Sequence, residues 1–151
     1  MSEDLFEPYR IGRLELKNRF VRSATWDATA DSSGAVTDTS VALYRELGRG
    51  GIGLIVSGYA FVSSLGQAVS GQYGVHSDDM LPGLRRMVEV AHQGGACITL
   101  QIVHAGINSN YLRQKDMTVL SVSNMPDIGR PHREMTDEDI ETIISDFTSA
   151  A

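Results

Sequence analysis

Hydrophobic and polar residues alternate along residues 94–106 in the manner of a buried β-strand that ends in polar groups. Successive strand side chains point to opposite faces, so Ile98, Leu100 and Ile102 share one aliphatic face. The other face carries smaller side chains and Gln101. Because a buried amide without hydrogen bonds costs free energy, we expect either a protein group or a polar ligand to bind Gln101. Its place near the end of the strand, where α/β folds bind ligands, keeps both alternatives open.

Two segments with the periodicity of amphipathic helices precede that strand. One helix is predicted from Thr37 or Asp38, either of which can cap it, to about Arg49. The second is predicted from Ser77 to about Gln93. Glycines follow both segments and end the helices before the chain enters an apolar run.

A third helix is predicted near the end of the chain. Thr136 and Asp139 have the spacing of a capping box, which satisfies the first backbone N–H groups of a helix. The apolar residues that follow recur at helical spacing and predict one buried face. These residues are Ile140, Ile143, Ile144 and Phe147.

Shorter patterns predict the remaining elements. Residues 9–17 alternate around a glycine as in a β-hairpin, and residues 19–25 predict a first strand. The apolar run 52–57 is typical of a fully buried parallel strand. We expect loops over residues 58–76 and 106–135.

The order of these elements predicts an α/β fold with a parallel sheet, specifically a (β/α)8 TIM barrel. Helices connect successive strands, tight glycine turns lead into the strands, and long loops leave them. A complete barrel needs about 250 residues. We therefore expect residues 1–151 to be the N-terminal part of one domain, with an N-terminal hairpin and about three β/α units. In this prediction the chain ends within or just after the third helix.

The charge and cysteine content narrow the function classes. A net charge of −6 disfavours nucleic acid as a partner, since non-specific binding needs a basic patch. The single cysteine, Cys97, cannot form an internal disulfide, which favours a reducing compartment. No apolar run reaches membrane-spanning length and no signal sequence is evident, so we expect a cytoplasmic protein without a membrane partner.

Two motifs invite a functional interpretation that their context weakens. Residues 48–53 match G-x-G-x-x-G, but a dinucleotide fingerprint follows a strand and opens a helix, whereas these glycines end a helix and precede a strand. A Rossmann-type nucleotide binder is therefore disfavoured. His104 follows the strand of residues 94–106, where a structural hydrogen-bonding role is more common than catalysis. No second histidine or carboxylate lies at metal-ligand spacing to it.

Small residues at two strand ends leave room for a flat ligand. Ser23–Trp26 end the first strand, where exposed backbone groups can bind a ring. Trp26 can stack on such a ring or fill the core. Gly58, which follows the second strand, can likewise make room for a ligand or allow a tight bend.

Taken together, several motifs resemble the old yellow enzyme family, the FMN-dependent NADH:flavin oxidoreductases. The resemblance covers nearly the whole chain, and the order and spacing of the motifs make it specific. The motifs are Leu5–Pro8, Ile11–Gly12, Leu16–Phe20, Val21–Thr25, Gly51–Gly58 and Gln101–Gly106.

The resemblance implies a (β/α)8 barrel with FMN at the face where the strands end. Backbone groups of the first strand end would line the flavin ring, the glycine after the second strand would leave space for it, and the amide after the third would bind its pyrimidine edge. Carried over by position, the cofactor-binding residues are Ser23, Ala24, Thr25, Trp26, Gly58 and Gln101.

Three positions depart from the family pattern. Many members carry Cys or Thr where this chain has Trp26, and some carry an aromatic residue where it has Ala28. The family's His-Ala-Gly-Arg ends here in Ile107. The substrate-binding histidines, the phosphate loops and the proton-donor tyrosine of the family come from later strands, so no catalytic residue is assigned.

The resemblance therefore implies an oxidoreductase that passes hydride from NAD(P)H through FMN to an activated alkene of the enone or enoate type. The alternative is a catalytically incomplete half-barrel that acts only by association or has no activity of its own. Three strands of eight leave open sheet edges, which a homo-oligomer or a missing C-terminal barrel half would cover.

Overall fold

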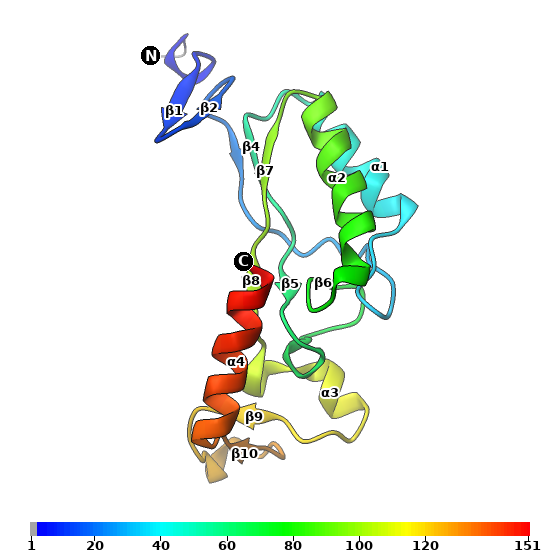
Figure 1. Cartoon of the computed structure of the whole chain (residues 1–151), viewed down its shortest axis with the longest axis vertical. Coiled ribbons are helices and arrows are strands. Elements are labelled where there is room, and N and C mark those ends of the chain that lie inside the picture. Colours follow the sequence, from blue (N-terminus) through cyan, green and yellow to red (C-terminus); the bar gives the residue numbers. More distant parts are fainter. Residues whose placement is uncertain (1–2) are drawn as a thin grey trace.

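The computed structural model describes residues 3–151, and its N-terminal part is a β-hairpin (Figure 1). Strands β1 (Tyr9–Ile11) and β2 (Leu14–Leu16) pair antiparallel, as predicted. Gly12 in the turn has φ of +58°, a left-handed conformation that glycine adopts without strain.

A parallel three-stranded sheet follows, and it confirms the predicted α/β architecture. Its strands are β3 (Val21–Arg22), β4 (Leu54–Val56) and β7 (Cys97–Thr99), in the order β3-β4-β7. Helix α1 (Asp38–Arg49) connects β3 to β4, and α2 (Leu81–Gln93) connects β4 to β7. Both helices lie side by side next to these strands (Figure 1). All three strands are shorter than the patterns predicted.

A second parallel sheet lies beyond the first, where a loop had been predicted over residues 58–76. That prediction is wrong, because the segment contributes β5 (Ala60–Phe61) and β6 (Tyr73–Gly74). The sheet order is β6-β5-β8, with β8 formed by Ile102–Val103. Strands as short as β5 and β6 leave no periodic signal of their own in the sequence, and pairing with distant residues creates them.

The predicted loop over residues 106–135 also contains regular structure. It forms α3 (Asn110–Gln114), β9 (Leu120–Ser121) and β10 (Arg133–Glu134), and the two strands pair in parallel. Helix α4 (Asp137–Ala150) ends the chain. Single 3-10 turns occur at Glu3–Leu5, Ser64–Gly66, Asp78–Met80, Gly106–Asn108 and Pro126–Ile128.

The predicted helix caps are present. Thr37 caps α1 and Thr136 caps α4, each in a capping box whose side chains and backbone N–H groups bond reciprocally. Ser77 caps the 3-10 turn that leads into α2. Glycine follows α1 and α2 directly, and Gly94 packs so closely on Gly48 that a Cβ atom would lie 2.3 Å from the Gly48 carbonyl carbon.

The hydrophobic core lies between α1, α2 and the sheet. Tyr44 of α1, Ile55 of β4 and Met87 of α2 are almost completely buried there. The core continues to the second sheet through Ala60 and Tyr73. The core therefore extends along both parallel sheets.

Candidate functional site

The candidate site lies where two extended segments of the chain, residues 54–61 and 97–103, are each interrupted between two short strands. β4 and β5 follow one another along the chain with only residues 57–59 between them, and β7 and β8 are separated only by residues 100–101. The two interruptions lie side by side, since β4 pairs with β7 above them and β5 pairs with β8 below. Gly58 and Gln101 both lie at this level.

The hydroxyl of Ser57 joins the two interruptions. Its Oγ accepts a hydrogen bond from the backbone N–H of Gln101 at 3.2 Å and donates one to the carbonyl of Gly58 at 2.8 Å. On either side the ladder is regular, with Ser57 N–H bonded to Thr99 and Ala60 N–H bonded to Gln101. The buried Ser57 hydroxyl therefore takes the place of one backbone hydrogen-bond partner between the two segments.

Gly58 brings the end of β4 against the segment that follows β3. A Cβ atom at this position would lie 3.1 Å from the Thr25 carbonyl oxygen and 3.3 Å from Asp27 Oδ2. The space beside Gly58 is thus filled by protein, and glycine allows the close approach of the two strand ends. Through Ser57 and Gly58, the structure brings Gln101 and the Ser23–Trp26 segment to one place.

Ser23–Trp26 present a largely accessible surface. Ser23 and Thr25 are exposed, Ala24 is half-buried, and Thr25 Oγ1 donates a hydrogen bond to the Ser23 carbonyl at 3.1 Å. Trp26 is 48% exposed, so its ring does not fill the core. Of the two interpretations of Trp26, the structure leaves the ring accessible to a ligand.

The expectation of a buried amide at Gln101 is wrong. The residue is exposed, and its side chain makes no hydrogen bond to any residue between 3 and 151. The alternation of residues 97–103 sets which face a side chain occupies, but burial depends on what covers that face. The amide is consequently free to bind a polar ligand, while the backbone of Gln101 is held by Ser57 and Ala60.

A polar network that the sequence did not reveal connects this level to α1 and to the segment after β3. The Tyr44 hydroxyl accepts a hydrogen bond from Gly58 N–H at 2.9 Å and donates one to Asp27 Oδ2 at 3.3 Å. Asp27 Oδ1 also accepts from the Thr29 hydroxyl, which bonds to Tyr73. Tyr44 lies within the segment predicted as an amphipathic helix, and helical periodicity gives no sign of the hydroxyl's partners.

Burial raises the pKa values of Tyr44 and Tyr73 above their usual range. Both hydroxyls therefore stay protonated at neutral pH and can donate hydrogen bonds. Nearby Asp27 adds to the rise in each case. The network positions the two strand ends and does not provide a proton-transfer group.

His104 makes a structural hydrogen bond of the kind that its context favoured. Its Nδ1 accepts a hydrogen bond from Gly106 N–H at 3.2 Å, and its ring packs closely on Gly66. Burial lowers the pKa of His104, so the imidazole is neutral at physiological pH. It lines an apolar cavity of about 410 Å³ together with Ile143 and Phe147 of α4.

Two other classes of site find no support within residues 3–151. That part of the chain contains no group of three or more His, Cys, Asp or Glu side chains able to hold a metal ion. None of its helices combines the length and the hydropathy needed to span a bilayer. The arrangement is suited instead to binding a flat polar ligand by backbone groups, an amide and an aromatic ring.

Comparison with known proteins relates the chain to one family over almost its whole length. The family model for the NADH:flavin oxidoreductase / NADH oxidase family matches residues 4–151. A 4,4'-dithiodibutanoate disulfide reductase of Rhodococcus erythropolis is 34% identical and aligns with 99% of this chain. An NADPH dehydrogenase of Geobacillus sp. (strain WCH70) is 32% identical and aligns with 100%. The chain spans only 37% and 44% of these relatives, respectively.

Solved structures show the same fold. A 2-naphthoyl-CoA reductase superposes on 99% of this chain with a TM-score of 0.90 and 31% identity, and the match covers 25% of that protein. An old yellow enzyme from Pichia sp. AKU4542 superposes on 98% with a TM-score of 0.88 and 24% identity, covering 42% of its length.

Proposed function

Because the chain belongs to the NADH:flavin oxidoreductase / NADH oxidase family, we propose that it forms the N-terminal part of an FMN-dependent oxidoreductase of the ene-reductase type. In this proposal residues 1–151 supply about three β/α units of a single (β/α)8 barrel domain. The reductant is NAD(P)H, and the substrate is a small molecule with an alkene conjugated to a carbonyl group, such as an enone or enoate. The family membership favours this function over a fragment that acts only by association.

The observation that carries the proposal is the convergence of three strand ends around a free amide. The side chain of Gln101 is exposed and without a partner in residues 3–151, at the level where the Ser23–Trp26 backbone is accessible. The pyrimidine edge of a flavin offers both donors and acceptors, and a carboxamide supplies both complements. These residues therefore fit the ring of FMN.

When bound, FMN would supply the hydride-transfer chemistry between NAD(P)H and the β-carbon of the activated alkene. This chain's own residues bind and orient the ring. Gln101 would hold its pyrimidine edge, the backbone of Ser23, Ala24 and Thr25 would line one side, and Trp26 would contact it with an accessible face. Gly58 contributes indirectly, since it lets the Thr25 backbone approach β4.

The rest of the barrel belongs to the proposal as well. The chain spans less than half of the Rhodococcus and Geobacillus relatives, and the remaining barrel half, or a second copy in a homo-oligomer, would cover the open edge of the sheet. We also propose a cytoplasmic location, which the single free thiol of Cys97 supports.

A chimera tests the proposal. Residues 1–151 replace the corresponding segment of the Geobacillus NADPH dehydrogenase, and the purified protein is assayed for retained FMN and for NADPH oxidation with 2-cyclohexenone. We expect both. Gln101→Leu should weaken flavin retention by about 1–3 kcal/mol, because it leaves polar flavin atoms unpaired.

The matched control is Gln93→Leu, since Gln93 is also exposed but lies at the end of α2. It should retain FMN as the unaltered chimera does. A chimera that folds without binding FMN would contradict the proposed cofactor. Equal FMN affinity in the Gln101→Leu and unaltered chimeras would contradict the role of Gln101.

A further inference from the structure

The hydroxyl of Ser57 holds the backbone of Gln101, whose side chain makes no hydrogen bond within residues 3–151. Ser57 Oγ accepts the Gln101 N–H at 3.2 Å, and the Ala60 N–H donates to the Gln101 carbonyl at 2.8 Å. The second bond joins two backbone groups and does not depend on a side chain. Ser57 is therefore the side chain through which the sequence can set the position of Gln101.

The chemistry of a hydroxyl explains why serine suits this position. A hydroxyl has one hydrogen to donate and lone pairs that accept. Ser57 donates its hydrogen to the Gly58 carbonyl at 2.8 Å, so a lone pair remains for the Gln101 N–H. An apolar side chain at this position would leave both backbone groups without this partner.

Burial makes the hydroxyl hard to replace. Ser57 is 0% exposed, and water therefore does not reach its hydroxyl. A backbone group that loses its partner at a buried position forfeits the hydrogen bond instead of exchanging it for one to water. The Ser57 N–H bonds to the Thr99 carbonyl at 2.9 Å, and β8 begins only at Ile102. Residues 100 and 101 thus lie between two ladders, where the Ser57 hydroxyl bridges the gap.

Gly58 connects this hydroxyl to the other side of the candidate site. The Gly58 N–H donates to the Tyr44 hydroxyl at 2.9 Å, and Tyr44 donates to Asp27 Oδ2 at 3.3 Å. Gly58 is therefore held at both of its polar backbone groups, at the N–H by Tyr44 and at the carbonyl by Ser57. A fixed Gly58 carbonyl gives the Ser57 hydroxyl, and with it the Gln101 N–H, a defined position.

We propose that Ser57 is a positioning residue for the flavin site, which holds the exposed Gln101 amide where the pyrimidine edge of FMN binds. This inference rests on the proposed function, because it uses the role given to Gln101 there. Ser57 itself touches neither cofactor nor substrate and acts only through Gln101. A group that is positioned before its ligand arrives loses less conformational entropy on binding, so a loosened Gln101 should bind FMN more weakly.

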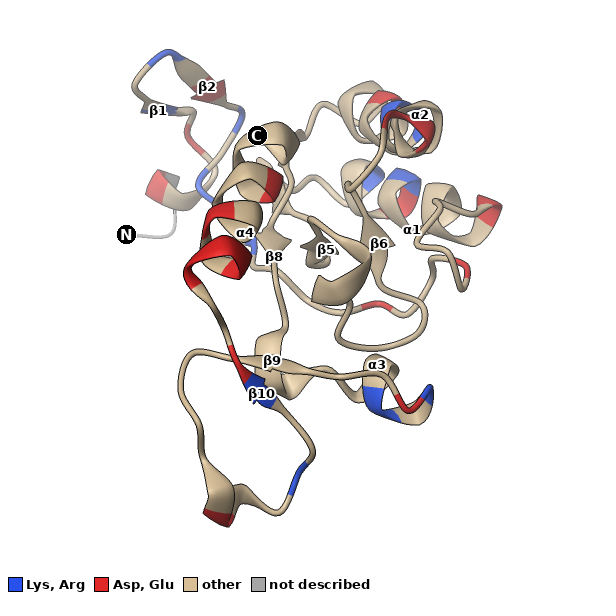
Figure 2. Ribbon diagram, turned by 60° about the horizontal axis from the view of Figure 1, so that its bottom comes forward, with Lys and Arg blue, Asp and Glu red and all other residues tan. Residues whose placement is uncertain are grey.

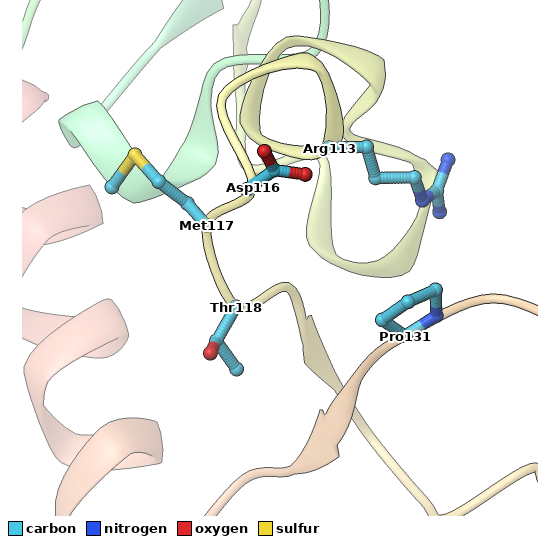
Figure 3. A pocket seen from close by; sticks show the side chains of 5 residues that line it. All are labelled: Arg113, Asp116, Met117, Thr118 and Pro131. Atoms are coloured by element: carbon cyan, nitrogen blue, oxygen red, sulfur yellow. The ribbon is translucent and has the colours of Figure 1, made fainter.

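Ser109 offers a matched control for Ser57. It is likewise 0% exposed, and its hydroxyl accepts the Leu112 N–H at 3.1 Å and donates to the Gln67 carbonyl. It caps α3, the helix beside a cavity of about 260 Å³ that Arg113 helps to line (Figure 3). None of its hydrogen bonds involves a residue proposed to bind FMN.

The first experiment measures amide hydrogen exchange by NMR in the whole chain, without flavin. Ser57→Ala should speed exchange of the Gln101 N–H by about threefold or more, since it removes the acceptor. Ser109→Ala should leave that rate unchanged and should speed exchange of the Leu112 N–H instead. An unchanged Gln101 exchange rate in folded Ser57→Ala would overturn the proposal.

The second experiment measures the dissociation constant of FMN by fluorescence titration in the chimera with the Geobacillus NADPH dehydrogenase. Ser57→Ala should weaken FMN binding about threefold to tenfold, and Ser109→Ala should leave it unchanged. In a chimera that already carries Gln101→Leu, Ser57→Ala should weaken binding by less than about twofold further, because the group that it positions is gone. A residue that only supports the fold would weaken binding equally in both backgrounds, and that result would overturn the proposal.

Failure of the proposed function gives a different result. Loss of FMN from the unaltered chimera would contradict the proposed cofactor, and the role of Ser57 would fall with it. Equal FMN affinity of the unaltered and Ser57→Ala chimeras would overturn the role of Ser57 alone. Should Ser57→Ala fail to fold, Ser57→Cys replaces it in both experiments and the same outcomes decide, because a thiol is only a weak donor and acceptor.

Discussion

Helices α1 and α2 bury part of every turn, whereas α4 buries none of its residues. Val41 and Tyr44 of α1 and Leu84 and Met87 of α2 lie in the core. In α4, Ile144 is 54% exposed, although it belongs to an apolar stripe with the same helical spacing.

The difference shows that an amphipathic pattern determines which face a helix can bury, while burial itself depends on a partner surface. The first two helices find that partner in strands of this chain. Helix α4 contacts β8 and lines the cavity beside His104, but much of its apolar face meets no described residue. Three predictions test this contrast.

The largest effect is expected from a matched pair of isoleucines. Ile55→Ala in β4 removes a side chain that is 0% exposed, and it should lower the free energy of unfolding by about 2–5 kcal/mol. Ile144→Ala in α4 should change it by about 0.5 kcal/mol or less. Urea denaturation of both variants checks this prediction, and similar losses would contradict the contrast.

A smaller effect is expected from the two helix caps, which have the same chemistry. Thr37→Ala removes the N-cap of α1 and should lower the global stability by about 0.5–2 kcal/mol. Thr136→Ala removes the N-cap of α4 and should increase local opening of that helix while the global unfolding midpoint stays the same. Amide hydrogen exchange distinguishes the two responses. Equal protection of the α4 amides in both variants would contradict the prediction that α4 opens independently of the core.

The smallest effect concerns pH at the start of α4, where three acidic residues lie in the first turn (Figure 2). The hydrogen bond from Arg133, followed by those from Thr136, holds the pKa of Asp139 well below its usual value. A lowered folded-state pKa stabilises the helix above the unfolded value of about 3.9, and this contribution is lost as the pH falls further. NMR shifts of α4 should therefore show fraying below about pH 4.

Asp139→Asn should remove that pH dependence. The matched control is Asp137→Asn in the same turn, because Asp137 takes no part in the capping box. It should leave the fraying profile intact. Fraying that persists unchanged in Asp139→Asn would show that another group is responsible.

Local signals in the sequence were sufficient for the elements whose stability is local. The caps at Thr37 and Thr136, the glycines after α1 and α2, and the hairpin turn at Gly12 all act on neighbouring backbone groups. Strands β5, β6, β9 and β10 were missed because each has two residues and depends on a partner distant in the sequence, whereas β8 lies within the strand predicted over residues 94–106.

The position of the candidate site could be predicted from the sequence, but the exposure and the hydrogen bonds of its residues could not. The residues at the ends of β3, β4 and β7 converge, which the order of elements implied. The exposure of Gln101 and the hydrogen bonds of Tyr44 with Gly58 and Asp27 depend on which surfaces meet in three dimensions. The hydrophobic periodicity of the sequence carries no information about how deeply a given residue is buried.

The Ser57 hydroxyl has a consequence for how such a site can evolve. At this level backbone groups and Ser57 join the two interrupted segments, and Tyr44 links Gly58 to Asp27. None of these bonds uses the side chains of Trp26 or Gln101. Substitutions at Trp26 and Gln101 can therefore accumulate under selection for a new ligand with little loss of folding stability. Ser57 itself tolerates less change, since a residue without a hydroxyl would lose the hydrogen bonds to the Gln101 N–H and to the Gly58 carbonyl.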